Sequence, residues 1–374
     1  MERRRDLNKE FLDYCFSQNF VKVKACLALD VDVNTTSDGG YWSSLIIAVC
    51  TNSVELLEIL LKQGNINTNL VMNHYNRGGI PDRWTALMFA SWKGKSLMVE
   101  RLVRVGELNV MYQDQSGDTA AHKASEGGHS QCVRILANTG RVDWDRGNVM
   151  GQTPLHLALQ GQHSSTVAVI VKQDIDYIVK THQGQTLAEV AVEGGDEKCV
   201  KILADQKKFD CWNISDKNGD TPIMKALKSQ KIGLVKVLVG VARVDLSLRD
   251  RLGWSLVFRA INIHQLGEWR GEVRRGTLSI IADLVKKILQ RLGRRTTGTS
   301  LARIAVEVGE VEDIKLLVQA GNVDWNEAAV NEDPAIMWAL KNEKLEIVSI
   351  LLTVPGVDLQ YRDKDNLTLA KIAR

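Results

Sequence analysis

The chain has 374 residues, a formal net charge of +3 and six cysteines. A chain of this length exceeds one ordinary compact core, and no run of residues is apolar enough to span a membrane. The first residues, MERRRDLNKEF, lack the apolar core of a signal peptide. We therefore expect a cytoplasmic or nuclear protein whose cysteines are reduced packing residues.

Helices dominate the predicted elements from the N-terminus onward. Residues 6–37 contain a two-helix pattern, and from Ser43 a helix-start motif recurs. Its clearest copy runs from Gly151 to Leu159, GQTPLHLAL, where Thr153 is placed as N-cap and Pro154 takes the first helical position. The equivalent positions are Ser43, Thr85, Thr119, Thr153, Thr186, Thr221, Ser255, Ser300, Pro334 and Thr368. Most are 33 to 35 residues apart, which is typical of a repeat architecture.

Each unit follows the same internal order. The first helix ends at a glycine or polar residue such as Gly94 or Gly128, and an amphipathic second helix follows, as in SLMVERLV from Ser96. A short extended segment, such as VDWD from Val142, and a polar turn, such as DQSGD from Asp114, complete the unit. The pattern predicts a helix, a turn, a second helix and a hairpin-like finger.

Two intervals are longer than the others, which predicts insertions. The first lies in a finger near residues 68–82, and the second lies between two helices near residues 264–276. Insertions in repeat proteins map to surface loops. At the other end, residues 363–374 open a further unit and stop within its first helix, so we expect the natural chain to continue past Arg374.

The recurring Gly–Thr/Ser–Leu–Ala skeleton resembles the ankyrin-repeat family, whose T-P-L-H-x-A signature is matched fully only from Thr153 to Ala158. This resemblance implies an all-α ankyrin-repeat solenoid of stacked helix-turn-helix units with protruding β-hairpin-like fingers. It covers residues 1–374 as a single domain, with a capping repeat at 6–37, about nine repeats at 38–362 and a partial repeat at 363–374. It also implies structural roles for His122 and His156, which occupy the signature histidine position.

By the same resemblance, the positions just before the N-cap residue and seven after it often contact partners on a concave face. Exposed tryptophans are typical interface anchors. The candidate partner-binding residues are Tyr41, Trp42, Trp84, Trp92, Asp118 and Trp254. Packing of these rings against adjacent fingers is the alternative. Trp144, Trp212 and Trp325 occupy a different position, which is apolar in neighbouring units, and are predicted to be core residues.

A basic segment interrupts the otherwise mixed charge. Residues 259–295 contain nine Lys and Arg against three Asp and Glu. Its candidate anion-binding residues are Trp269, Arg270, Arg274, Arg275, Arg294 and Arg295. They would attract an acidic protein, a nucleic acid or an anionic lipid; the alternative is a loop that its charges keep solvated.

Motifs that carry chemistry do not occur in this sequence. It contains no H-E-x-x-H, no G-x-S-x-G and no metal-spaced Cys/His cluster. We expect no enzymatic activity, no cofactor and no metal. The expected function is that of a monomeric protein-protein interaction scaffold. Two alternatives remain: the targeting or adaptor arm of a larger protein or enzyme continuing past Arg374, and an anionic-ligand binder acting through the basic segment.

Overall fold

A computed structural model of the chain describes residues 2–72, 83–246, 248–251, 256, 301–308, 311–320, 323–326, 333–363 and 365–372. The chain divides into two compact units, Met1–Cys211 and Trp212–Arg374, which are described separately. Most of the finger insertion, residues 73–82, and the whole insertion near 264–276 lie outside the described residues. The predicted insertions and the single-domain boundaries therefore stay predictions.

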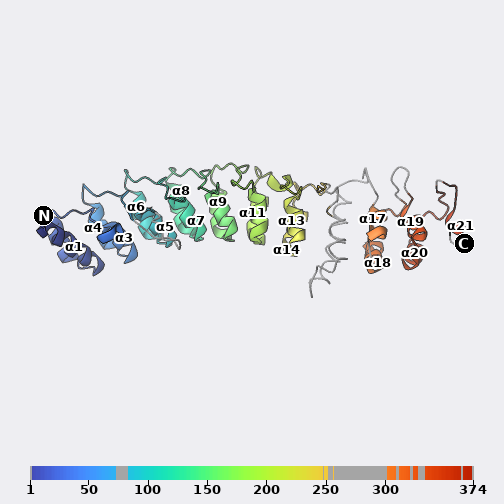
Figure 1. The fold of residues 1–374 in the computed structure, drawn as a ribbon, viewed down its shortest axis with the longest axis horizontal. Coiled ribbons are helices and arrows are strands. Elements are labelled where there is room, and N and C mark those ends of the chain that lie inside the picture. The colour runs from blue at the N-terminus through green and yellow to red at the C-terminus, as the bar shows by residue number, and fades with distance from the viewer. Residues whose placement is uncertain are drawn as a thin grey trace. The chain divides into compact units, whose positions relative to one another are not determined.

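Unit 1 consists of successive helix pairs (Figure 1). Its helices are α1 (Glu2–Phe16), α2 (Phe20–Ala28), α3 (Ser44–Cys50), α4 (Val54–Leu61), α5 (Ala86–Trp92), α6 (Ser96–Val103), α7 (Ala120–Glu126), α8 (Ser130–Asn138), α9 (Pro154–Gln160), α10 (Ser164–Ile170), α11 (Leu187–Gly194) and α12 (Glu197–Ala204), with a short 3₁₀ helix, η1 (Asp38–Gly40). Each first helix packs on the next first helix, in the order α1, α3, α5, α7, α9 and α11. Each second helix from α4 onward packs on the next second helix, in the order α4, α6, α8, α10 and α12. Stacked helix pairs are therefore confirmed in this unit.

Unit 2 repeats the same arrangement in its described parts. Its helices are α13 (Pro222–Lys228), α14 (Ile232–Gly240), α17 (Leu301–Val308), α18 (Val311–Ala320), α19 (Ala335–Lys341), α20 (Leu345–Leu351) and α21 (Leu369–Ile372); a second 3₁₀ helix is η2 (Cys211–Asn213). Helix α13 packs on α14, α17 on α19, and α18 on α20. The short α21 packs on α19.

The helix starts form as the motif predicts. Thr153 is the N-cap of α9, and Pro154 is the first residue of that helix. The Nδ1 atom of His156 accepts the backbone N–H of Thr153 at 3.2 Å, so it satisfies a donor that the helix itself leaves free. His122 does the same for Thr119 at 3.1 Å. Both histidines are fully buried, which confirms their structural role.

The fingers contain little regular strand. Strands β1 (Val71–Met72) and β2 (Trp84–Thr85) pair antiparallel, with Val71 opposite Thr85. Other described fingers close instead through a side-chain oxygen: Oδ1 of Asp114 accepts the backbone N–H of Ser116 and of Asp118, at 2.9 and 2.8 Å, and Oδ1 of Asn148 accepts that of Gln152 at 3.0 Å. Gly117 turns this finger with φ +73°, a conformation that suits glycine. The fingers are thus mainly side-chain-closed turns.

The predicted core tryptophans are buried. Trp144, Trp212 and Trp325 are 7, 1 and 5% exposed, which confirms the prediction. All six cysteines are free, and five of them are buried. Burial raises the pKa of the Cys15 thiol to about 12 and that of Cys132 to about 11, so these thiols stay protonated and act as packing residues.

Candidate partner-binding face

The two positions that the resemblance singled out lie against each other in five of the described repeats. One precedes the N-cap residue and the other, eight residues on, is the last or the last but one residue of the first helix. The pairs are Trp84 with Trp92, Gln152 with Gln160, Gln185 with Glu193, Asp220 with Lys228, and Asp333 with Lys341. A seven-residue helix is only about 10 Å long, so side chains at its two ends can meet along it. We call the surface formed by the three pairs of unit 1 the pair face; the two pairs of unit 2 are not part of it.

The chemistry of the pairs changes along the chain. The amide nitrogen of Gln152 donates to Oε1 of Gln160 at 3.2 Å, whereas the side-chain nitrogen Nζ of Lys341 lies 2.9 Å from Oδ2 of Asp333. The repeat that contains Asp118 departs from this rule because its other position holds Glu126, a like charge. Asp118 pairs with Lys123 instead, at 2.8 Å.

Aromatic rings gather at the N-terminal part of the pair face. Trp92 is half-buried, its ring centroid lies 5.2 Å from that of Trp84, and Nζ of Lys93 lies 4.0 Å from its centroid. This ammonium is placed for a cation–π contact. In the preceding repeat, half-buried Trp42 lies edge-on against Phe16, with centroids 5.5 Å apart. We call Phe16, Trp42, Trp92 and Lys93 the aromatic patch.

Phe16 is 40% exposed, and it was not among the partner-binding residues predicted from the sequence. It ends helix α1, whose repeat lacks the Thr-Pro start, so no motif fixed its position. Aligning the end of α1 with the ends of the other first helices would have found it. Tyr41 is half-buried beside Trp42, and its ring covers Gly39, where an added Cβ would lie 2.4 Å from the ring.

Trp84 is not an exposed anchor, so that expectation is wrong. It is 4% exposed, and its indole Nε1 donates to Oδ2 of Asp114 at 2.9 Å. The Lys123 ammonium lies 4.8 Å from the Trp84 ring centroid, and Trp92 packs against its edge. Trp84 is buried because these groups, from its own and the next repeat, enclose both its ring and its N–H.

Asp118 is likewise inaccessible, since it is only 7% exposed. Its Oδ1 accepts the side-chain amide of Asn148 at 2.9 Å, and its Oδ2 lies 2.8 Å from Nζ of Lys123. Burial would lower the pKa of the Lys123 ammonium, but Asp118 and Asp114 outweigh that effect and raise it. The expectation that Asp118 contacts a partner is therefore wrong for this structure: its carboxylate is consumed by a buried ion network.

The other candidate residues cannot be placed. Trp254 and the basic residues Trp269, Arg270, Arg274, Arg275, Arg294 and Arg295 lie outside the described residues. In the part of the chain that the structure describes, no three His, Cys, Asp or Glu side chains come together as a metal site would require.

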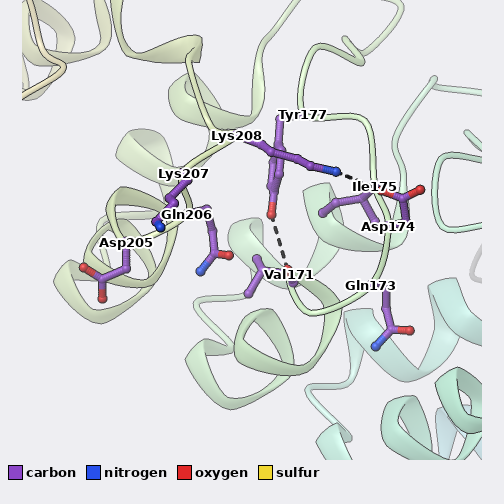
Figure 2. A pocket seen from close by; sticks show the side chains of 9 residues that line it. All are labelled: Val171, Gln173, Asp174, Ile175, Tyr177, Asp205, Gln206, Lys207 and Lys208. Carbon is purple, nitrogen blue, oxygen red and sulfur yellow. Dashed lines mark hydrogen bonds and ion pairs between the residues drawn. The ribbon is translucent and has the colours of Figure 1, made fainter.

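A cavity of about 330 Å³ lies away from the pair face, between the segments that follow α10 and α12 (Figure 2). Val171, Ile175 and Tyr177 form its buried apolar side, and the Tyr177 hydroxyl donates to the Val171 carbonyl at 3.4 Å. Asp174 and Lys208 form an ion pair at 3.2 Å, and both side chains are largely exposed. Its charged residues carry both signs, so the cavity has no clear preference for one charge of ligand.

Comparison with known families adds a direct match. Residues 87–181, which extend from α5 to the finger after α10, match the family model of ankyrin repeats in three copies. The fold is thus an all-α ankyrin solenoid. Ankyrin repeats are generally protein-interaction modules and are typically not catalytic. Among the described helices, none is both long and apolar enough to cross a bilayer.

Proposed function

We propose that the protein is a non-catalytic scaffold that binds a protein partner through the pair face, with the aromatic patch as its anchor. The observation that carries the proposal is the placement of three rings in three successive repeats. Phe16 and Trp92 end the first helices α1 and α5, and Trp42 directly precedes the N-cap of α3 between them. These rings stay at least partly accessible, whereas Trp84 beneath Trp92 is buried. Large rings on a rigid support favour binding because little side-chain entropy is lost.

The rest of the pair face would supply specificity. Its amide bonds hold their side chains in fixed positions before a partner arrives, as in the bond between Gln185 and Glu193 at 2.8 Å. Preorganised polar groups reduce the cost of ordering on binding. The buried network of Asp114 and Lys123 would support the aromatic patch indirectly, because it holds Trp84, on which Trp92 rests.

The experiment compares two variants in quantitative affinity capture from a lysate of the source cells. The first is Trp92→Ala combined with Phe16→Ala. The matched control is Leu97→Ala, which removes an exposed apolar side chain, 57% accessible, from the second helix of the same repeat as Trp92. Circular dichroism verifies folding.

We expect partner proteins that the wild type and the Leu97 variant capture to be lost with the double variant. Retention of every partner by the double variant would exclude the aromatic patch as the binding site. If the double variant also shows a lower melting temperature, the single Trp42→Ala variant repeats the comparison at a ring that does not pack on Trp84.

A further inference from the structure

Three kinds of side-chain hydrogen bond recur between neighbouring repeats. In the first, the residue at the signature histidine position donates to a carbonyl of the next repeat. Nε2 of His122 lies 3.0 Å from the Gln152 oxygen, and in unit 2 Arg303 reaches the Asp333 oxygen at 3.5 Å. This forward bond ties the start of one first helix to the finger of the next repeat.

The second kind points backward. The N-cap residue of a second helix donates to a carbonyl at the end of the preceding first helix. His129 reaches the Trp92 oxygen at 2.8 Å, His163 reaches the Glu126 oxygen at 2.9 Å, and Lys344 reaches the Val306 oxygen at 2.9 Å. This backward bond connects the two helix rows of adjacent repeats.

In the third kind, which we call the clamp, one side chain both donates to and accepts from the backbone of the next repeat. The residue that makes the clamp follows the buried apolar position of its finger. Asn69 donates to the Glu107 carbonyl at 3.0 Å and accepts the Asn109 N–H at 2.7 Å. The same two bonds are made by Asn34, Asn213 and Asn326 with their following repeats. Asp145 makes the accepting half with the Asp176 N–H at 2.9 Å.

The backward bond and the clamp are both missing where the α9–α10 repeat meets the α11–α12 repeat, whereas each other described junction of unit 1 has at least one of them. The forward bond is missing here too, as it is where Ile46 and Met88, which cannot donate, hold its position. Nε2 of His156 is buried and has no hydrogen-bond partner, so the forward bond is absent. Asp196 occupies the backward position, but a carboxylate cannot donate, and it binds the Lys198 N–H of its own helix at 3.0 Å. Ile178 occupies the clamp position with no polar atom and is 69% exposed.

The sequence around the backward bond changes as a set. At the intact junctions His129 and His163 lie over Gly94 and Gly128, where a Cβ would come within 2.5 Å of the imidazole. The equivalent residue at this junction is Gln162, whose side chain would occupy that space. At this junction, the two positions that support the backward bond elsewhere therefore hold Asp196 in place of the histidine and Gln162 in place of the glycine.

Two of the polar contacts that remain here are weak, and the third is a backbone bond between the two repeats that the preceding junction also has. The thiol of Cys211 donates to the Tyr177 carbonyl at 2.9 Å, the backbone of His182 donates to Met150 at 2.9 Å, and the ion pair of Lys208 with Asp174 is solvent-exposed. A thiol is a weak donor, and exposed ion pairs contribute little. The cavity of about 330 Å³ lies at this same junction, between the segments that follow α10 and α12 (Figure 2).

We propose that the junction between the α9–α10 and α11–α12 repeats is a built-in opening point, at which unit 1 separates locally before its other repeats do. In a repeat array each interface contributes separately to stability, so an interface without its recurring bonds opens first. Such opening would expose the facing surfaces of α10 and α12 while the aromatic patch, whose nearest residues lie two repeats before the α9–α10 repeat, stays folded. The inference does not depend on the proposed partner.

The chain carries a matched pair of reporters for this test. Cys132 in α8 and Cys199 in α12 occupy equivalent positions of their second helices, and each is 1% exposed. Burial raises the pKa of Cys132 to about 11 and that of Cys199 to about 12, so the intrinsic reactivity of the thiolate does not favour Cys199. Faster modification of Cys199 would therefore report opening rather than chemistry.

The experiment labels the native full chain with iodoacetamide and follows each cysteine by peptide mass spectrometry. We expect Cys199 to react at least about tenfold faster than Cys132, and Ile178→Asn, which restores the clamp, to slow Cys199 without affecting Cys132. The matched control Leu97→Asn, also an exposed apolar residue, should change neither rate. Equal rates for the two cysteines in the wild type would overturn the proposal.

A second repair variant gives an independent check. Gln162→Gly together with Asp196→His rebuilds the backward bond. Because the Cys199 thiol donates to Asp196 at 3.1 Å, this variant is followed by its urea midpoint, which should rise, and not by the Cys199 rate. If both repair variants fold, by circular dichroism, but Ile178→Asn leaves the Cys199 rate unchanged and the second variant leaves the urea midpoint unchanged, the missing bonds do not control opening and the proposal fails.

Discussion

The imidazole of His163 lies over Gly128 of the preceding repeat while its Nε2 bonds the Glu126 carbonyl at 2.9 Å. Two separate features, the backbone conformation and the close approach of the imidazole, require glycine at position 128. Its φ is +70°, and a Cβ built there would lie 2.5 Å from Nδ1 of His163. The turn between two helices and the contact between two repeats thus depend on one residue.

Gly128→Ala should destabilise the protein by more than about 1 kcal/mol, because alanine is strained at positive φ and displaces the imidazole. The measurement is the shift in urea midpoint followed by circular dichroism. Gly106→Ala is the matched control, since a Cβ there meets nothing within 4 Å. A Gly128 variant as stable as the Gly106 variant would contradict the proposed contact.

Asn69→Ala should cost about 1–2 kcal/mol, because it removes both bonds that Asn69 makes to the next repeat, at 3.0 and 2.7 Å. Denaturant unfolding measures the change. Asn138, exposed at the end of α8, provides the control, and Asn138→Ala should have an effect below about 0.5 kcal/mol. Equal effects of the two substitutions would show that the clamp contributes nothing.

Lys123→Met should be the most damaging of these substitutions, with a loss of about 3–5 kcal/mol, because it leaves the carboxylates of Asp114 and Asp118 buried without their cation. Lys201→Met, which removes an exposed helix-surface pair with Glu197, should cost less than about 0.5 kcal/mol. Adding Asp118→Asn to Lys123→Met should recover part of the stability. No recovery in the double variant would argue against charge burial as the cause.

The stability should fall in mild acid because of His156. Burial lowers the pKa of its imidazole from 6.5 to about 4, so the unfolded chain binds a proton below about pH 6.5 while the folded chain does not. Its contribution is fully present above about pH 6.5 and declines, by at most about 1.4 kcal/mol per pH unit, as the pH falls toward 4. Urea titrations at several pH values should show a shallower pH dependence for His156→Gln. A His156→Gln variant that keeps the pH profile of the wild type would refute this assignment.

Much of the fold could be predicted because the repeat period is written locally. The Thr153–Pro154 start and the helical spacing of apolar residues depend only on neighbours in sequence, and both are found as expected. The fingers were less predictable, since Asp114 closes its turn through a side chain rather than a strand pair. The basic segment and Trp254 lie in the part of the chain that the structure does not describe.

The sequence by itself determined the helix pairs and their period, because these follow from short-range spacing, and its resemblance to the ankyrin-repeat family indicated the two positions that form the pair face. Only the tertiary structure decided which members of that face are accessible. Trp84 and Trp92 are equivalent as candidates in sequence, but Trp84 is enclosed by Asp114 and Lys123, which lie 30 and 39 residues further along the chain. Burial depends on such contacts between repeats, and so does the absence of the bonds between the α9–α10 and α11–α12 repeats.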